Sequence, residues 1–313
     1  MNTTIRRGIK QEVIFTKIVF MNIVFNVNPL GMEGLGSTLT SLIRNCSDNT
    51  KLTLCFLCSE LKTKDKNNIR QLLQDEFFKG NIEFFDFNAK QTFGHLKSLH
   101  GDWTTYGRLL IPSIVKSDNA LYLDSDLVIN ADILALQNFT ANTIISAVHG
   151  STVRYALDNP FFIKKLNWKP DTAYFNAGVL FFNIAAWKAT NIDKKVKEIT
   201  DKYSNELISH DQTLLNAVCE GNFGHLPKEF NLPWYPNKSQ PANADKSIIH
   251  FVGSPKPWDL LGKIIHEGNG TWKTYNTKFW KNQYGNITVQ KLIRTWKIRR
   301  SILKNLQSKL TKK

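Results

Sequence analysis

The stretch that decides the fold is Ala120-Leu121-Tyr122-Leu123-Asp124-Ser125-Asp126-Leu127-Val128-Ile129. It is typical of a buried strand, but two carboxylates interrupt it, and burying them there is costly unless something compensates their charge. Residues i and i+2 of an extended chain point to the same side, so Asp124 and Asp126 can hold one cation. Such oxygen ligands suit Mg²⁺ or Mn²⁺, which bridge to a diphosphate. The alternatives are an Asp-Ser-Asp turn and a helix cap.

Strands and helices alternate outward from this stretch. The 313 residues are 42% hydrophobic and 21% charged, which excludes wholesale disorder. Apolar strands separated by helices indicate an α/β fold with a largely parallel sheet. We expect strands at 23–27, 52–57, 82–87, 120–129, 144–148, 179–182 and 247–251, and helices at 37–44, 64–78, 103–114, 184–188, 192–202 and 211–218. The predicted organisation is an extension over residues 1–20, one domain over 21–287 and a tail over 288–313.

A second polar cluster follows the last predicted strand. His250 comes directly after apolar residues and precedes Gly253 and Lys256. A glycine lets backbone approach a phosphate, and a lysine can neutralise it. A histidine beside the two carboxylates would complete a mixed nitrogen and oxygen site, which favours Mn²⁺ over Mg²⁺. Taken alone, a histidine in such a place is more often a satisfied polar residue.

The cysteines are expected to be structural. Cys55 and Cys58 lie three residues apart in the predicted strand, on opposite faces, which is a poor geometry for a shared metal or a redox pair. Buried free cysteines fit a reducing compartment. No stretch reaches the roughly 18 to 20 apolar residues of a membrane span. Because Lys17 interrupts the apolar run near the N-terminus, secretion is not expected.

Five motifs occur in order: TTYGRLLIP (104–112), LYLDSDLVI (121–129), YFNAGVLFFN (174–183), HDQTLLNAV (210–218) and HFVGSPKPW (250–258). Through them the chain resembles glycosyltransferase family 8. This family comprises retaining, nucleotide-sugar-dependent enzymes and includes bacterial lipopolysaccharide galactosyl- and glucosyltransferases. The resemblance implies a Rossmann-like nucleotide-sugar-binding domain of the GT-A type over residues 21–287, with a mixed, mostly parallel sheet and a basic C-terminal helical tail.

The resemblance also implies a metal and diphosphate site. Asp124 and Asp126 match the family's metal-binding pair. His250 matches the third protein ligand of Mn²⁺, with Mg²⁺ as the alternative ion. Lys256 and the backbone of Gly253 match the contact to the diphosphate.

The sugar-binding and catalytic residues follow from the same resemblance. Arg108 matches an arginine that reaches the donor sugar and diphosphate; on the residues alone, a salt bridge on a helix surface is the alternative. Asn176 matches an amide that contacts the donor sugar, and His100 falls where the family carries a histidine near the acceptor. Asp211 and Gln212 match the pair beneath the anomeric carbon.

The chain departs from the family pattern near the nucleotide. The family's first strand usually ends in an aspartate that touches the uracil, whereas this chain has Asn26-Val27-Asn28. Asn28 can still pair with a base edge through its amide, so UDP stays the expected nucleotide. Residues 31–36, GMEGLG, do not follow the dinucleotide pattern GxGxxG and are expected to form a flexible loop. His149 stands where relatives carry an acidic sugar contact, so the donor sugar can differ from galactose.

The resemblance implies a retaining, Mn²⁺-dependent transfer of a hexose, galactose or glucose, from a UDP-sugar to a surface glycan such as lipopolysaccharide core. A glycoprotein or another surface polymer is the alternative acceptor. A non-catalytic nucleotide-sugar- or glycan-binding protein of the same fold is the alternative function. A covalent intermediate and front-face attack both stay open, because Gln212 is a poor nucleophile where a retaining glycosidase has a carboxylate.

The tail concentrates positive charge. Residues 288–313 carry nine of the fifteen net positive charges and no acidic residue. Apolar residues recur there with helical spacing, which predicts an amphipathic helix on an anionic membrane surface: Val289, Leu292, Ile293, Trp296, Leu303, Leu306 and Leu310. We therefore expect a cytoplasmic protein, peripheral at the inner face of the membrane, and no nucleic-acid partner. A solvated tail is the alternative.

Overall fold

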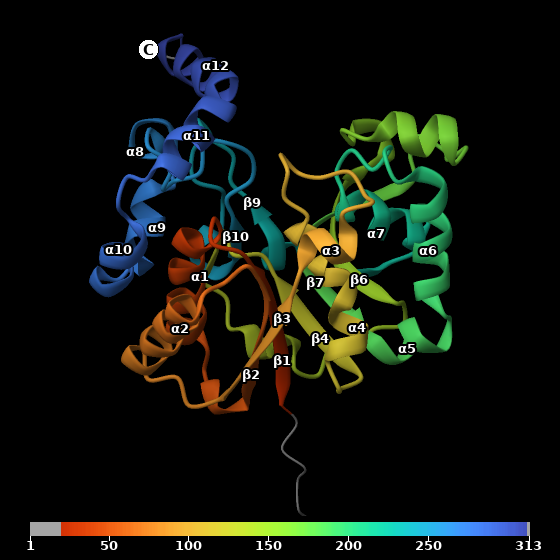
Figure 1. Cartoon of the computed structure of the whole chain (residues 1–313), viewed down its shortest axis with the longest axis horizontal. Coiled ribbons are helices and arrows are strands. Elements are labelled where there is room, and N and C mark those ends of the chain that lie inside the picture. Colours follow the sequence, from red (N-terminus) through yellow and green to blue (C-terminus); the bar gives the residue numbers. More distant parts are fainter. Residues whose placement is uncertain (1–19, 312–313) are drawn as a thin grey trace, which may run out of the picture.

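The computed structural model describes residues 20–311, and most of the predicted extension over residues 1–20 lies outside them (Figure 1). Its ten strands form two sheets, one of seven strands in the order β3-β2-β1-β4-β7-β6-β8 and one of three in the order β5-β10-β9. The strands are β1 (Met21–Val27), β2 (Leu52–Ser59), β3 (Asn81–Phe87), β4 (Asn119–Leu123), β5 (Leu127–Ile129), β6 (Ile145–Thr152), β7 (Ala173–Asn183), β8 (Gly224–Leu226), β9 (Leu232–Pro233) and β10 (Ile248–His250).

The large sheet is mixed and mostly parallel, as predicted. Strand β1 pairs in parallel with β2 and β4, β2 pairs in parallel with β3, and β6 pairs in parallel with β8. Only β7 runs against its neighbours in this sheet, β4 and β6. The carboxyl ends of β1 and β4 therefore meet at one edge, and polar residues that follow these strands come together there.

Helices cover both faces of the large sheet (Figure 1). One apolar cluster joins α1 and α2 to one face, through Leu35 and Leu72, and another joins α5 and α7 to the other, through Trp187 and Leu214. The helices are α1 (Met32–Asn45), α2 (Thr63–Asp75), α3 (Ala89–Phe93), α4 (Ile111–Ile114), α5 (Ile184–Ala189), α6 (Ile192–Tyr203), α7 (Asp211–Cys219), α8 (Gly262–Ile265), α9 (Asn269–Tyr275), α10 (Lys278–Tyr284), α11 (Val289–Lys297) and α12 (Arg299–Leu310).

The CxxC prediction is confirmed. Cys55 packs in the cluster on one face of the sheet and Cys58 in the cluster on the other. Among residues 20–311 all four cysteines are free. Burial raises the pKa of both thiols to about 12, so they stay protonated and act as small apolar core residues.

The single strand predicted over 120–129 is wrong. The chain leaves the large sheet after Leu123 and enters the small sheet at Leu127. The Asp-Ser-Asp segment makes the turn between them, because Asp124 N–H donates to the carbonyl of Gly178 at 2.9 Å and Leu127 pairs with His250 across the antiparallel β5–β10 ladder. The turn that separates the strands thus also sets His250 opposite the two carboxylates.

Three predicted helices differ from the structure in type or bounds. Residues 104–110 wind as a 3-10 helix, and the α-helix begins only at Ile111 because Pro112 suits a first helical turn. The flexible loop predicted over residues 31–36 is wrong, because α1 begins at Met32 rather than 37 and Gly31 is its N-cap. Gly36 allows this packing, since a Cβ there would lie 2.1 Å from the Trp280 ring. Helix α2 ends at Asp75, before the predicted 78.

The tail forms two helices, α11 and α12, rather than one continuous helix. It packs on the domain: Ile302 is buried, Lys291 pairs with Glu33 at 2.7 Å and Arg294 pairs with Asp259 at 2.6 Å. An outer apolar face stays exposed, formed by Val289, Leu292, Ile293, Trp296 and Leu303. No helix among residues 20–311 is long and apolar enough to cross a membrane.

We predict that His266 makes the free energy of unfolding depend on pH. Its side chain is buried against Phe251 and Trp234, and its Nδ1 accepts the Gly268 N–H at 3.1 Å. Burial lowers the pKa of His266 to about 4. Because the unfolded pKa is about 6.5, the folded state binds fewer protons, and this stability is lost as the pH falls from 6.5 to 4.

Between pH 7 and pH 5 this group should remove about 2 kcal/mol from the free energy of unfolding. Urea titrations of His266→Asn, which keeps a hydrogen-bond acceptor, should lack this loss. His149→Asn, at an exposed histidine, should keep it. Equal pH slopes for His266→Asn and the wild type would contradict the assignment.

Candidate active site

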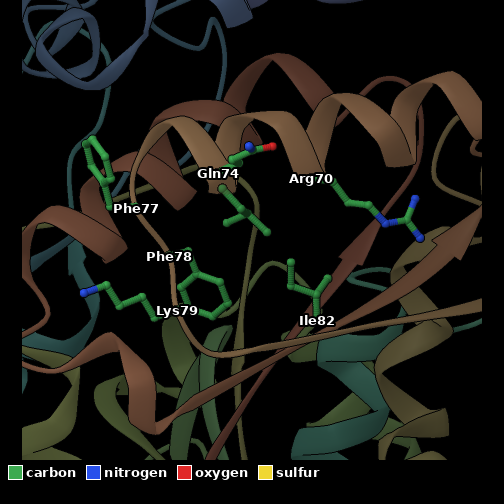
Figure 2. A pocket seen from close by; sticks show the side chains of 7 residues that line it. Arg70, Gln74, Phe77, Phe78, Lys79 and Ile82 are labelled. Atoms are coloured by element: carbon green, nitrogen blue, oxygen red, sulfur yellow. The ribbon is translucent and has the colours of Figure 1, made fainter.

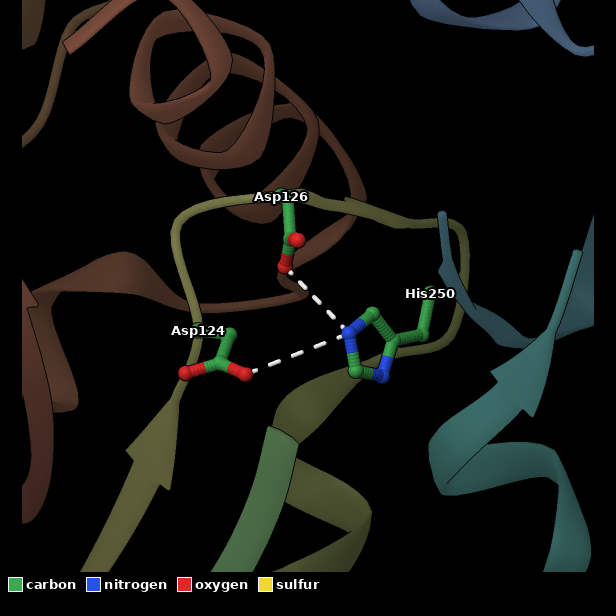
Figure 3. A group of neighbouring side chains, drawn as sticks. All are labelled: Asp124, Asp126 and His250. Carbon is green, nitrogen blue, oxygen red and sulfur yellow. Dashed lines mark ion pairs between the residues drawn. The ribbon is translucent and has the colours of Figure 1, made fainter. Parts of the chain in front are cut away.

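Three potential metal ligands meet at the edge between the two sheets. Asp124 and Asp126 flank the turn after β4, and His250 ends β10. The Nε2 atom of His250 lies 3.3 Å from Asp126 Oδ1 and 3.9 Å from Asp124 Oδ2 (Figure 3). One ligand atom from each residue lies within 4.8 Å of the others. The predicted cluster is thus assembled.

The donor set fits a divalent cation. Asp126 Oδ1 is buried and, within residues 20–311, has no hydrogen-bond partner. Carboxylates suit Mg²⁺ and Mn²⁺, and an imidazole is a common ligand of transition-metal ions. Burial opposes ionisation of Asp126, but the Lys256 ammonium, at 2.6 Å, outweighs it and holds the pKa of this carboxyl well below its usual range. Asp126 therefore keeps its negative charge and is ready to bind a cation.

Arg108 is a buried ion-pair centre and not a surface residue. Its Nε lies 2.9 Å from Asp211 Oδ2 and its Nη2 lies 3.0 Å from Asp124 Oδ1. Its Nη1 donates to the carbonyl of Ala177 at 2.5 Å, and its guanidinium lies over the Tyr122 ring at 4.3 Å. Burial raises the pKa of Asp211, and the neighbouring Arg108 opposes that shift. The arginine thus holds two carboxylates side by side.

The predicted catalytic pair lies beside the potential metal ligands. Asp211 and Gln212 begin α7, and Gln212 Oε1 accepts hydrogen bonds from Ala177 N–H at 3.0 Å and from Asn176 Nδ2 at 3.2 Å. Gln212 Nε2 donates to the Tyr174 hydroxyl at 2.9 Å. A cavity of about 140 Å³ opens here, lined by Leu99, Thr105, Arg108, Asp124, Ala177, Gly178, Ser209, His210, Asp211 and Gln212.

Asn28 is held in place by a hydrogen bond to Asp102, a residue that no sequence motif singled out. Its Nδ2 donates to Asp102 Oδ2 at 2.5 Å, and its Oδ1 accepts the Gly31 N–H at 2.9 Å. His100, two residues before Asp102, is exposed, and its carbonyl accepts a hydrogen bond from Lys297 of the tail at 3.4 Å. His100 thus lies at the rim of the site, outside the cluster.

Lys256 anchors the loop after β10 through its ammonium group and through its backbone N–H. The Lys256 ammonium pairs with Asp126 and donates to the Phe251 carbonyl, while its backbone N–H donates to Asp259 Oδ2 at 2.6 Å. Gly253 has φ +80°, a backbone conformation that L side chains rarely adopt. Asp259 in turn pairs with Arg294 of the tail. No sequence motif includes Asp259, and its role is evident only from these contacts in the structure.

Two other features lie away from the cluster. The ring of His149 stacks on that of Phe223 with centroids 6.3 Å apart, and the side chain is exposed. A hollow of about 330 Å³ lies at the amino end of β3 (Figure 2). The potential metal ligands lie at the carboxyl end of the parallel strands, the opposite end of the sheet. The hollow is lined by Arg70, Leu73, Gln74, Phe77, Phe78, Lys79 and Ile82. Since it contains no carboxylate or imidazole, it is not the chemical centre.

The mixed, mostly parallel sheet with helices on both faces is the GT-A fold. The model of glycosyl transferase family 8 matches residues 20–262, and the chain belongs to this family. The structure also superimposes on that of the galactosyltransferase LgtC, with a TM-score of 0.67 and 22% identity over 86% of this chain and 98% of that one. Glycosyltransferase GlyE of Streptococcus pneumoniae gives a TM-score of 0.61 at 20% identity, covering 84% of this chain and 61% of GlyE.

Two curated relatives extend the comparison. The lipopolysaccharide 1,3-galactosyltransferase of Salmonella typhimurium is 31% identical over 189 residues, 53% of this chain and 54% of that enzyme. General stress protein A of Bacillus subtilis is 24% identical over 72% of this chain and 82% of its own length. The aligned part is thus about half of the Salmonella enzyme and most of the Bacillus protein.

We predict that Arg108→Met destabilises the protein by about 3 kcal/mol at neutral pH, since removing one partner of a buried ion pair leaves uncompensated charge. Here Asp124 and Asp211 would face each other without the guanidinium. Urea unfolding in EDTA measures the change. Arg154→Met removes an exposed pair with Asp171, whose side chains are 50% and 76% exposed, and should change stability by less than about 1 kcal/mol. Equal losses in the two variants would contradict the account.

Proposed function

We propose that the protein is a retaining, metal-dependent hexosyltransferase that moves galactose or glucose from a UDP-sugar to a cell-surface glycan. One observation carries the proposal: in a family 8 chain, Asp124, Asp126 and His250 converge beside a cavity lined by Arg108 and Asp211. A non-catalytic binding protein of the same fold would have no need of this array of buried charges, whose ion pairs are difficult to maintain in a protein interior.

Asp124, Asp126 and His250 would hold Mn²⁺, with Mg²⁺ as the alternative. The ion would supply positive charge beside the donor diphosphate, where negative charge develops as the sugar–phosphate bond breaks. Lys256 now neutralises Asp126 at 2.6 Å. Once a cation compensates that carboxylate, the Lys256 ammonium can turn to a phosphate oxygen, while Gly253 lets the backbone approach the same group.

The residues beneath the sugar favour front-face attack. Gln212 is a poor nucleophile, and its Oε1 already accepts two hydrogen bonds, from Asn176 and from Ala177 N–H. Asp211, held by Arg108 at 2.9 Å, can stabilise positive charge at the anomeric carbon. The acceptor hydroxyl would then approach from the side of the departing phosphate, whose oxygen takes its proton.

Lipopolysaccharide core is the acceptor that we favour, supported by the 31% identity to the Salmonella galactosyltransferase. A glycoprotein or another surface polymer is the second choice. Asn28, fixed by Asp102, Thr104 and Gly31, would present its amide to the uracil edge. His100, at the rim, would face the acceptor.

A UDP-release assay tests this function. We expect release from UDP-galactose or UDP-glucose with Mn²⁺, and a loss of about 100-fold or more with EDTA or in Asp126→Asn, because the developing diphosphate charge is no longer stabilised. Asp171→Asn, at an exposed carboxylate, should keep wild-type activity. No release and no binding of any UDP-sugar would reject the proposal.

We further propose that α11 and α12 seat the enzyme on an anionic membrane at the cytoplasmic face. The exposed apolar side chains of Val289, Leu292 and Trp296 lie on the same two helices as the exposed cations Arg299 and Arg300. Apolar burial and charge attraction act together in such surface helices. Seating would bring His100, which contacts the tail, toward a lipid-linked acceptor.

Charge reversal tests the seating without unfolding the tail. The triple variant Arg299→Glu, Arg300→Glu, Lys304→Glu changes exposed residues and should reduce flotation with phosphatidylglycerol vesicles at least tenfold, since each cation near the surface contributes about 1 kcal/mol. The control variant changes three exposed lysines elsewhere: Lys64, Lys169 and Lys188. Equal flotation of the two triple variants would reject the proposed membrane surface.

A further inference from the structure

One buried amide that no sequence motif singled out touches both the metal cluster and the sugar-binding residues. Asn231 ends a short 3-10 helix just before β9, and its side chain is 6% exposed. Its Oδ1 lies 3.0 Å from His250 Nδ1, and its Nδ2 donates to Asn176 Oδ1 at 3.1 Å. Asn231 therefore bridges a potential metal ligand and a residue that we place at the donor sugar.

Backbone groups fix the orientation of this amide. The Gly178 N–H donates to Asn176 Oδ1 at 2.9 Å, and because a backbone N–H can only donate, that atom must be the oxygen. The Asn231 atom facing it is then the nitrogen, and the Asn231 atom facing His250 is the oxygen. The Ala177 N–H fixes Gln212 Oε1 in the same way, so Asn176 Nδ2 donates to it.

The orientation of Asn231 decides the tautomer of His250. An amide oxygen can only accept, so His250 Nδ1 carries the hydrogen. In the neutral imidazole the other nitrogen, Nε2, then keeps its lone pair. This lone pair faces Asp126 Oδ1 at 3.3 Å and Asp124 Oδ2 at 3.9 Å. Three electron-rich atoms thus converge, which is an arrangement for a cation and not for a hydrogen bond.

We propose that Asn231 is a positioning residue that holds His250 as the Nδ1–H tautomer, so that Nε2 is available to a divalent cation. The proposal rests on the metal site of the proposed function. A partner on the second ring nitrogen commonly orients a metal-binding histidine, and its loss weakens metal binding about 10- to 100-fold. Through Asn176 and Gln212 the same amide connects the metal ligand to the residues beneath the donor sugar.

Two variants separate these roles. Asn231→Leu removes both hydrogen bonds and should raise the Mn²⁺ Kd about 10- to 100-fold in electron paramagnetic resonance titrations. Asn231→Asp keeps an acceptor for Nδ1–H but cannot donate to Asn176, so its Kd should stay within about threefold of the wild type. The control Asn183→Leu removes an amide that likewise bridges two partners, Ala141 and Ala186, at the far end of β7.

Nitrogen-15 NMR of the metal-free wild type reads the tautomer directly, with the His250 signals assigned from their absence in His250→Gln. We expect the Nδ1–H form in the wild type and in Asn231→Asp, and a mixture in Asn231→Leu. An Nε2–H tautomer in the wild type, or unchanged Mn²⁺ affinity in a folded Asn231→Leu, would overturn the inference. Should the wild type bind no Mn²⁺, the metal proposal fails, while the tautomer measurement still decides the role of Asn231.

Discussion

The site depends on how the charges of three carboxylates are balanced, one of them buried (Asp211) and two partly buried (Asp124 and Asp126). Asp124, Asp126 and Asp211 share one region with two permanent cations, Arg108 and Lys256, each within 3.0 Å of a carboxylate. Three negative charges against two positive ones leave one negative charge uncompensated. Uncompensated charge in a protein interior is energetically unfavourable, so a further cation at the point where the ligand atoms converge would stabilise the site. In the proposed function, a metal ion would make up this deficit and would attract the donor diphosphate.

Much of this arrangement could be predicted from local sequence, because strands and helices of an α/β fold carry their own apolar patterns. The five motifs marked the strands, helices and loop that carry the site residues, and the structure places Asp124, Asp126 and His250 together as expected. The break between β4 and β5 was missed because both strands are equally apolar, and only their pairing partners differ. Asn231 was missed because its role depends on contacts 55 and 19 residues away in the chain.

The tail shows the same limit of sequence patterns. Its helical spacing and positive charge were visible, but not its docking on the catalytic domain. Arg294 pairs with Asp259, whose carboxylate also accepts the Lys256 N–H, and Ser301 donates to the carbonyl of Ser254. The loop that carries Lys256 therefore rests on the tail helices. The part of the chain proposed to meet the membrane is in direct contact with the part proposed to meet the diphosphate.

The most direct test of the account is a crystal structure with Mn²⁺ and UDP, with the ion located by its anomalous scattering. The account predicts one peak bound by Asp124, Asp126 and His250 Nε2, with the Lys256 ammonium moved from Asp126 to a phosphate oxygen. A peak bound elsewhere, or UDP bound with Lys256 still paired to Asp126 and no ion between the carboxylates, would contradict it.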